Sequence, residues 1–242
     1  MIKTVIITGG AGIIGQATAK TLKHKGYQVV LADLSFREQQ DDFTYQQCDV
    51  TQDSAVGQLF GRYADTLCGI VLAAGIEGAV ASIDDISEEQ FDRVMDVNVK
   101  GIWLGLKHAI RIFKPRGQGN IIALASTSGM LGVPRMAAYS ASKHAVMGLV
   151  KSAAREVARF GVRVNSVCPG PVESAMMKRI DGTLLAQDPN RFYGNSDASG
   201  AIPMKRYATP EEVAHAIVYL CSDDSSFTTG NHITLDGGLM CR

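Results

Sequence analysis

A tyrosine and a lysine four positions apart, Tyr139 and Lys143, have the residue types and the spacing that suit acid–base chemistry. On a helix, positions i and i+4 lie one turn apart on the same face. An ammonium placed there favours the phenolate, so we expect Lys143 to lower the pKa of Tyr139 from about 10 toward the working pH, as a general acid/base requires. Taken alone, the spacing fits an ordinary surface pair better than a catalytic pair.

A glycine-rich turn near the N-terminus is typical of a phosphate site. Residues 2–8 predict a buried strand, the stretch Gly9-Gly10-Ala11-Gly12-Ile13-Ile14-Gly15 follows, and an amphipathic helix is expected over roughly 14–24. Glycines let the backbone approach a ligand closely, and a helix N-terminus offers free N–H groups to a pyrophosphate. A tight strand-to-helix turn also needs glycine for steric reasons. The position after a strand and before a helix favours the phosphate site.

The strand expected over 28–33 ends in an acidic residue, Asp33, 18 residues after Gly15. In a dinucleotide fold, such a carboxylate accepts hydrogen bonds from the adenosine ribose and repels a 2′-phosphate. The alternative is an ordinary Asp that begins a turn. The sequence therefore predicts NAD in preference to NADP, although Arg37 nearby works against that preference.

Strands alternate with helices along the whole chain. Further strands are expected over 43–48, 67–73, 120–125, 162–167 and 232–235, and further helices over 52–65, 87–112, 136–160 and 210–221. Capping boxes begin two of these helices, at Ser87 and Thr209. This alternation predicts an α/β fold, a Rossmann-like doubly wound parallel sheet of about seven strands with helices on both faces, in one domain over 1–242.

Candidate functional residues gather at one edge of that sheet. Ligands of doubly wound sheets bind beyond the carboxyl ends of the strands, and Gly9, Asp33, Gly75, Ser126 and Pro169 all follow strand ends. Asn98 falls inside the helix expected over 87–112, where asparagine has poor propensity.

Composition excludes several classes of function. Lys plus Arg and Asp plus Glu both number 24, so no basic face indicates nucleic acid. We expect no membrane span, because no apolar run reaches about 18 residues, and no signal peptide, so a cytoplasmic location. Five scattered cysteines indicate a reducing compartment and neither a disulfide framework nor a metal site.

In its ordered set of motifs the sequence resembles the short-chain dehydrogenase/reductase family over nearly its whole length. Ser126 lies 13 residues before Tyr139, the family's usual spacing. The matching pieces are Thr8-Gly9 with Gly12 and Gly15, Asp33, Asp49-Val50, Ala73-Ala74-Gly75, Asn98-Val99-Lys100-Gly101, Ser126, Tyr139 with Lys143, Asn165, Pro169-Gly170 and Asp236-Gly237-Gly238.

This resemblance implies a catalytic set. Tyr139 would be the general acid/base on the substrate oxygen, and Ser126 would hydrogen-bond the same oxygen, with Ser128 a less well-spaced rival. Lys143 would bind the nicotinamide ribose and depress the pKa of Tyr139. Asn98 would help hold a water chain from Lys143 to solvent.

The resemblance also implies residues that bind NAD. Asp49 and Val50 would flank the adenine, and the backbone around Pro169 and Gly170 would hold the nicotinamide. The full expected set is Gly9, Gly12, Ile14, Gly15, Asp33, Asp49, Val50, Ala73, Ala74, Gly75, Tyr139, Lys143, Pro169, Gly170 and Val172.

Two positions depart from the pattern of the short members of the family. Their middle glycine would fall at position 13, where this chain has Ile13 and places the glycine at 12. Leu72 and Ala73 stand where those members usually have two asparagines, one of which braces the central strand. Another group must satisfy that backbone here.

Residues 172–203 are expected to form a loop or helix segment that covers the substrate. The apolar lining of the substrate pocket would come from Met176, Met177, Phe192, Tyr193 and Ile202. Three glycines, Gly182, Gly194 and Gly200, would let the segment move as a lid. A long surface loop needs apolar anchors in any case, so both interpretations stay open.

The expected function is an NAD-dependent oxidoreductase that interconverts a secondary alcohol and a ketone. One alternative is a 3-oxoacyl thioester reductase, against which Asp33 argues because such enzymes normally use NADPH. Another is an NAD(H)-binding sensor or scaffold without turnover, which need not keep Ser126 and Tyr139. The resemblance further implies a homotetramer or homodimer built on the helices over 87–112 and 136–160.

Overall fold

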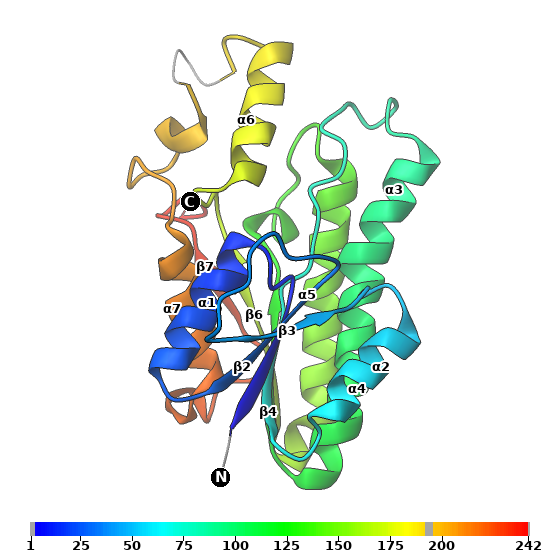
Figure 1. Cartoon of the computed structure of the whole chain (residues 1–242). Helices are drawn as coiled ribbons and strands as arrows, with labels where there is room; N and C mark the ends of the chain where they lie inside the picture. Colours follow the sequence, from blue (N-terminus) through cyan, green and yellow to red (C-terminus); the bar gives the residue numbers. More distant parts are fainter. Residues whose placement is uncertain (1–2, 192–195, 242) are drawn as a thin grey trace.

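Within residues 3–191 and 196–241, which the computed structural model describes, seven parallel strands form one sheet in the order β3-β2-β1-β4-β5-β6-β7 (Figure 1). The order reverses between β1 and β4, so the carboxyl ends of these two strands meet at the switch point where doubly wound sheets bind ligands. The expected Rossmann-like fold is confirmed. The strands are β1 (Thr4–Thr8), β2 (Gln28–Asp33), β3 (Thr44–Gln47), β4 (Leu67–Leu72), β5 (Gly119–Leu124), β6 (Val162–Pro169) and β7 (His232–Leu235).

Helices cover both faces of the sheet, as predicted (Figure 1). In β1, Val5 and Ile7 join one apolar core and Ile6 joins the other, because successive side chains of a strand point to opposite faces. The first core lies under α1 (Ile13–His24) and α7 (Pro210–Cys221), and the second lies under α2 (Asp53–Arg62), α4 (Gly101–Arg116) and α5 (Ala137–Val157). In the part of the chain described, no helix is long and apolar enough to cross a membrane.

Both predicted capping boxes are present. The Ser87 hydroxyl accepts from the backbone N–H of Gln90 to begin α3 (Glu88–Met95), and the Thr209 hydroxyl accepts from that of Glu212 to begin α7. These side chains satisfy N–H groups that a helix leaves without partners in its first turn.

The helix expected over 87–112 is not continuous. A π-helical turn, η1 (Asp96–Lys100), separates α3 from α4, and the buried Asn98 lies at its centre. Its side chain bonds outward to three groups: the Ile76 N–H and carbonyl, and the Ser142 hydroxyl. A π turn inserts an extra residue and re-aims a side chain, often at a functional site.

The segment expected to be a mobile cover contains a helix, α6 (Ala175–Gln187), which stands above the carboxyl end of the sheet (Figure 1). The Ser174 hydroxyl caps it by accepting from the Met177 N–H at 2.9 Å. Gly182 lies inside this helix, and the expected movement of the segment as a lid stays a prediction. Phe192, Tyr193 and Gly194 lie outside the described residues.

Candidate active site

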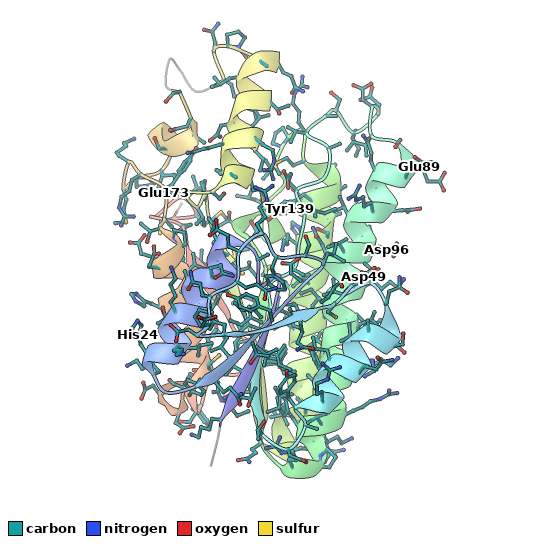
Figure 2. The ribbon with its side chains drawn as sticks, in the orientation of Figure 1. His24, Asp49, Glu89, Asp96, Tyr139 and Glu173 are labelled. Carbon is teal, nitrogen blue, oxygen red and sulfur yellow. The ribbon has the colours of Figure 1, made fainter. Side chains whose placement is uncertain are left out.

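The four residues expected to be catalytic come together at the carboxyl end of the sheet. Tyr139 and Lys143 lie in the first two turns of α5, Ser126 follows β5, and Asn98 lies in the π turn. The Lys143 ammonium is 5.5 Å from the centre of the Tyr139 ring and donates to the Leu124 carbonyl at 2.7 Å. In Figure 2, Tyr139 lies directly below α6.

Burial sets the acidity of the central pair. It raises the pKa of Tyr139 to about 12, with the Ser126 hydroxyl acting in the opposite direction and the Glu77 carboxylate adding to the rise. Burial also lowers the pKa of Lys143 to about 8. The expected lowering of the Tyr139 pKa by Lys143 is therefore not found in this structure, because burial outweighs any attraction and the ammonium is directed to the Leu124 carbonyl.

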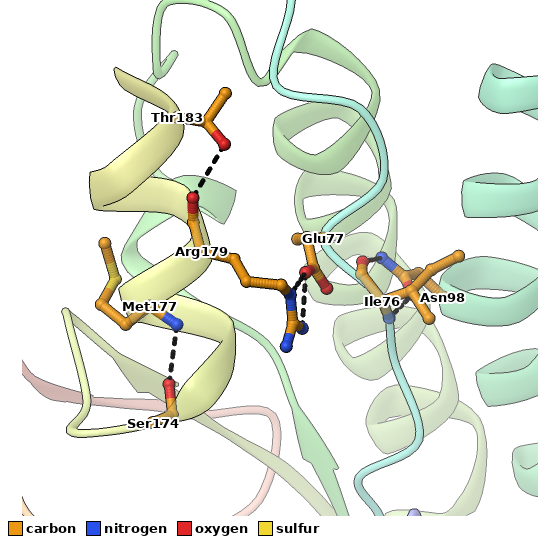
Figure 3. Close-up of polar contacts among 7 residues, drawn as sticks. All are labelled: Ile76, Glu77, Asn98, Ser174, Met177, Arg179 and Thr183. Atoms are coloured by element: carbon orange, nitrogen blue, oxygen red, sulfur yellow. Dashed lines mark hydrogen bonds and ion pairs between the residues drawn. The ribbon is translucent and has the colours of Figure 1, made fainter. Parts of the chain in front are cut away.

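The Asn98 side chain joins three parts of the site. Its Oδ1 accepts from the Ile76 N–H at 2.9 Å, and its Nδ2 donates to the Ile76 carbonyl at 3.0 Å (Figure 3). The same Nδ2 donates to Ser142 Oγ at 3.0 Å, and Ser142 in turn donates to the Tyr139 carbonyl at 2.7 Å. Asn98 thus holds the chain after β4 against the start of α5, while its part in a water chain remains a prediction.

Ser126 and Ser128 are not equivalent. Ser126 Oγ accepts from the Ser128 N–H at 3.1 Å and donates to the Pro169 carbonyl at 3.4 Å. It also acts to lower the pKa of Tyr139, against the larger effect of burial. Both side chains are buried, but it is the Ser126 hydroxyl that bonds to β6 and lowers the pKa of Tyr139. These contacts favour Ser126 over its rival.

The glycine turn is tight although Ile13 replaces a glycine. Gly9 has a φ of +70°, and a Cβ at this position would lie 2.6 Å from the Ala74 nitrogen. A Cβ at Gly15 would lie 2.6 Å from the Gly9 carbonyl oxygen, and the Gly12 N–H donates to that oxygen at 3.1 Å. Ile13 is 41% exposed and does not obstruct the turn.

The start of α1 fits an anionic group. Gly12 provides no side-chain cap, and the first turn, which contains Ile14, holds no acidic residue. The first N–H groups of a helix have no partner within it, and they carry the positive end of its dipole. Gly9 lies so close to the backbone of Ala73 and Ala74 that no side chain fits between them at this corner. These residues fit the pyrophosphate of a dinucleotide.

Asp33 lies at the same corner. Its Oδ2 accepts from the Ala11 N–H at 2.9 Å and its Oδ1 accepts from the Leu34 N–H at 2.8 Å, so the carboxylate ties the end of β2 to the glycine turn. A hollow of about 220 Å³ adjoins it, and neither lysine nor arginine is among its described lining residues. The described lining residues of this hollow are Leu34, Ser35, Phe36, Gln39, Tyr45 and Gln47.

The departure at Leu72 is satisfied by the sheet itself. Leu72 lies in the ladder between Thr8 of β1 and Ala123 of β5, and the Ala73 N–H donates to the Thr8 carbonyl at 3.1 Å. The Leu72 side chain is buried against Gly105 of α4. At this position, apolar packing of the Leu72 side chain therefore replaces the asparagine that braces the central strand in other short members of the family.

Asp49 and Val50, expected beside the adenine, follow β3. Asp49 Oδ1 accepts from the Thr51 N–H and hydroxyl at 2.9 and 2.7 Å, which closes a local turn. Val50 packs against Gly101, the first residue of α4. Their backbone is thereby fixed near the site, whereas contact with an adenine remains a prediction.

Residues after β6 form the opposite wall. The Gly170 N–H donates to the Leu235 carbonyl at 2.9 Å, and Val172 is buried and bridges to Ala208. Together with Pro169, which accepts from Ser126, these contacts fix the expected nicotinamide-binding backbone.

Helix α6 packs an apolar surface over Tyr139. Met176 and Met177 contribute to it as expected, whereas Ile202 is buried beside Gly237 instead. The cluster comprises Met136, Ile180 and Leu184, with Val80, Val133, Tyr139, Met176 and Met177 packed against them.

Sequence reasoning missed one charged pair at this site. Arg179 of α6 donates from Nε to Glu77 Oε1 at 2.8 Å, and its second nitrogen lies 2.6 Å from the same oxygen (Figure 3). Glu77 belongs to no motif, and the available signal was its place five residues after the end of β4.

Comparison with known proteins agrees with this geometry. A family model described as enoyl-(acyl carrier protein) reductase matches residues 9–240. The chain is 36% identical to (+)-cis,trans-nepetalactol synthase of Nepeta racemosa, covering 99% of this chain and 91% of that protein. It is 35% identical to 2,5-dichloro-2,5-cyclohexadiene-1,4-diol dehydrogenase of Sphingobium indicum, covering 98% and 96%.

Solved structures match over the whole sheet and its helices. NAD⁺-bound xylitol dehydrogenase superposes with a TM-score of 0.89 at 31% identity, covering 98% of both chains. ElxO with NADP bound superposes with a TM-score of 0.89 at 27% identity, covering 100% of both chains. With the ordered motifs, the glycine turn and the Ser126–Tyr139–Lys143 site in place, this chain belongs to the short-chain dehydrogenase/reductase family.

Proposed function

We propose that this protein is an NAD(H)-dependent oxidoreductase that interconverts a secondary alcohol and a ketone. The observation that carries the proposal is the convergence of Ser126, Tyr139 and Lys143 beside a helix N-terminus that fits a pyrophosphate. Relatives named for action on a cyclohexadiene diol and on xylitol support a substrate of the hydroxyl-bearing class.

The residues act on one oxygen of the substrate. With its pKa raised to about 12, Tyr139 is a phenol at neutral pH, ready to donate its proton to a carbonyl oxygen; in the reverse direction its phenolate accepts the hydroxyl proton. The Ser126 hydroxyl orients the same oxygen, and Lys143, with a pKa of about 8, exchanges protons near neutral pH. NAD, when bound, supplies the hydride acceptor or, as NADH, the donor.

Asp33 supports NAD over NADP. A carboxylate at the end of β2 accepts from ribose hydroxyls and repels a 2′-phosphate, and neither lysine nor arginine lines the adjoining hollow within the described residues. The structural neighbours include one protein with NAD⁺ and one with NADP, so cofactor choice is tested directly on this chain. We expect kcat/KM to be higher with NAD than with NADP.

The first experiment is a turnover screen with polyols, hydroxy acids, hydroxyacyl thioesters and simple secondary alcohols, following the formation of NADH. Tyr139→Phe removes the proton donor while leaving the ring, so we expect a loss of roughly 10²- to 10⁴-fold in kcat, the range for one acid–base group.

Binding of NADH to the variant, followed by its fluorescence, is the control and should match that of the wild type. Full activity of Tyr139→Phe would contradict the mechanism. Binding without any turnover across the screen would favour a sensor or scaffold instead.

A further inference from the structure

Glu77 lies in a segment that the site holds rigidly. A Cβ at Gly75 would be 3.3 Å from Asn98 Oδ1 and 3.6 Å from Lys143 Nζ, so this strand end touches the catalytic groups. Asn98 then binds both the N–H and the carbonyl of Ile76. Glu77 is the next residue, and its backbone position is fixed from the π turn.

The Glu77 carboxylate is only partly used by its ion pair. Both nitrogens of Arg179 approach Oε1, and among the described residues no donor contacts Oε2. The Glu77 side chain is 17% exposed, whereas that of Arg179 is 61% exposed. The carboxylate is therefore the more buried partner of the pair, and the arginine is the more exposed one (Figure 3).

Apolar residues lie near this ion pair in the sequence. Val80 lies three residues on, and Met176, Met177 and Ile180 come from α6 on either side of Arg179 in the sequence; all four pack in one cluster with Tyr139. An ionised carboxylate only accepts hydrogen bonds, and bonds to it are stronger than those between neutral groups. A negatively charged substrate at this position would be repelled by the carboxylate.

We propose that Glu77 is a specificity-determining residue that selects neutral substrates with a second hydroxyl group, whose O–H donates to Glu77 Oε2. This inference rests on the proposed alcohol–ketone function and narrows its substrate to diols, polyols and hydroxyketones, at the expense of hydroxy acids. Arg179 balances the charge and holds α6 in place, but it does not contact the substrate in this proposal.

The test compares matched alcohols in four proteins. Wild type, Glu77→Gln, Glu77→Met and Arg179→Met are assayed with butane-2,3-diol, butan-2-ol and 3-hydroxybutyrate, and the readout is the ratio of kcat/KM values between substrates. A ratio cancels any general loss of activity or of folded protein. Glu77→Gln keeps an acceptor without the charge, and Arg179→Met keeps the carboxylate without its partner.

For Glu77→Met we expect the diol-to-monoalcohol ratio to fall by roughly 10- to 100-fold, the range for losing a hydrogen bond to a charged group. The decrease should be smaller for Glu77→Gln, and Arg179→Met should keep the wild-type ratio. The ratio for 3-hydroxybutyrate against butan-2-ol should rise in Glu77→Met, because the repelling charge is gone.

An unchanged diol ratio in Glu77→Met would overturn the inference. So would an equal decrease in Arg179→Met, which would show that the pair only holds α6. A wild-type protein that oxidises monoalcohols or hydroxy acids with NAD but no diol or polyol of the turnover screen would overturn the inference alone, whereas inactivity across the whole screen would overturn the proposed function and the inference with it.

Discussion

At the scale of single residues, the site depends on two ionisable groups that burial perturbs in opposite directions. Tyr139 keeps its proton and Lys143 tends to lose its own, so both favour the neutral form at a mildly alkaline pH. Desolvation disfavours whichever form is charged. The pair is therefore poised for proton exchange with a substrate oxygen rather than for a permanent ion pair.

Lys143 gives a stability prediction with a definite sign. Its pKa is lowered from 10.5 to about 8 in the folded protein, so keeping it charged opposes folding below pH 8, and this cost is released as the pH rises to 10.5. At about 1.36 kcal/mol per pH unit between the two pKa values, the effect is roughly 3 kcal/mol. We expect the wild type to gain stability relative to Lys143→Met across this window.

Urea unfolding of both proteins at several pH values measures this difference. Because the tyrosines and cysteines are shared by both proteins, their titration cancels in the comparison. A difference in unfolding free energy that stays constant from pH 7 to 10.5 would contradict the prediction that burial of the Lys143 ammonium opposes folding.

Residues with a motif could be predicted from sequence, and residues without one could not. Ser126, Tyr139 and Lys143 were identifiable from their place in the ordered set of motifs that resembles the family, and the structure brings them together. Glu77 was missed because its importance comes from an ion pair with Arg179, 102 residues away, which no local pattern encodes. The pKa of Tyr139 was mispredicted because spacing reveals the nearby ammonium but not the degree of burial.

At the scale of elements, hydrophobic periodicity and caps located most of the fold. β2, β7 and α7 were predicted to the residue, because each is bounded by a cap, a turn or a change of period. The π turn was missed because the bonds from Asn98 to Ile76 and Ser142 that accompany it are tertiary. Helix α6 lies inside the loop or helix segment expected over 172–203, but its bounds were not predicted, because the contacts that hold its apolar residues over Tyr139 are tertiary.

Packing of α4 on β4 predicts an unusual sign for a helix substitution. Gly105→Ala would normally stabilise a helix by about 1 kcal/mol. Here the new Cβ would lie 2.3 Å from Cδ2 of Leu72, which is only 1% exposed and has no room to move. We expect a loss of roughly 1–3 kcal/mol, the usual cost of overpacking a core.

Gly61→Ala in α2 is the matched control, since nothing lies within 4 Å of the added Cβ. Thermal or urea unfolding should show it unchanged or slightly stabilised. Equal stabilisation of both variants would mean that Leu72 does not seal the interface between α4 and the sheet.

At the scale of the whole molecule, we propose that two exposed aromatic side chains take part in self-association. Phe91 of α3 is 42% exposed and Trp103 of α4 is 48% exposed. Both fall in the helices on which we expect a homodimer or homotetramer to be built. Large exposed apolar side chains can indicate a protein–protein contact when they form part of a larger apolar patch.

Light scattering after gel filtration tests this assembly. We expect a mass of two or four chains for the wild type and a smaller mass for Trp103→Glu, because a buried unpaired charge would weaken the interface. Lys20→Glu, on an exposed position of α1, should leave the mass unchanged. A wild-type protein that runs as one chain would refute the expected oligomer.

The double contact of Asp33 has a consequence for protein engineering. Exchanging this residue for one without a side-chain acceptor, such as alanine, to admit a cofactor with an extra phosphate, would also remove the acceptor of the Ala11 N–H at the glycine turn. The exchange would loosen the turn at the pyrophosphate end while it altered recognition at the ribose end. A successful redesign therefore has to supply a second side chain that anchors Ala11, and selections for altered cofactor use should recover such paired changes.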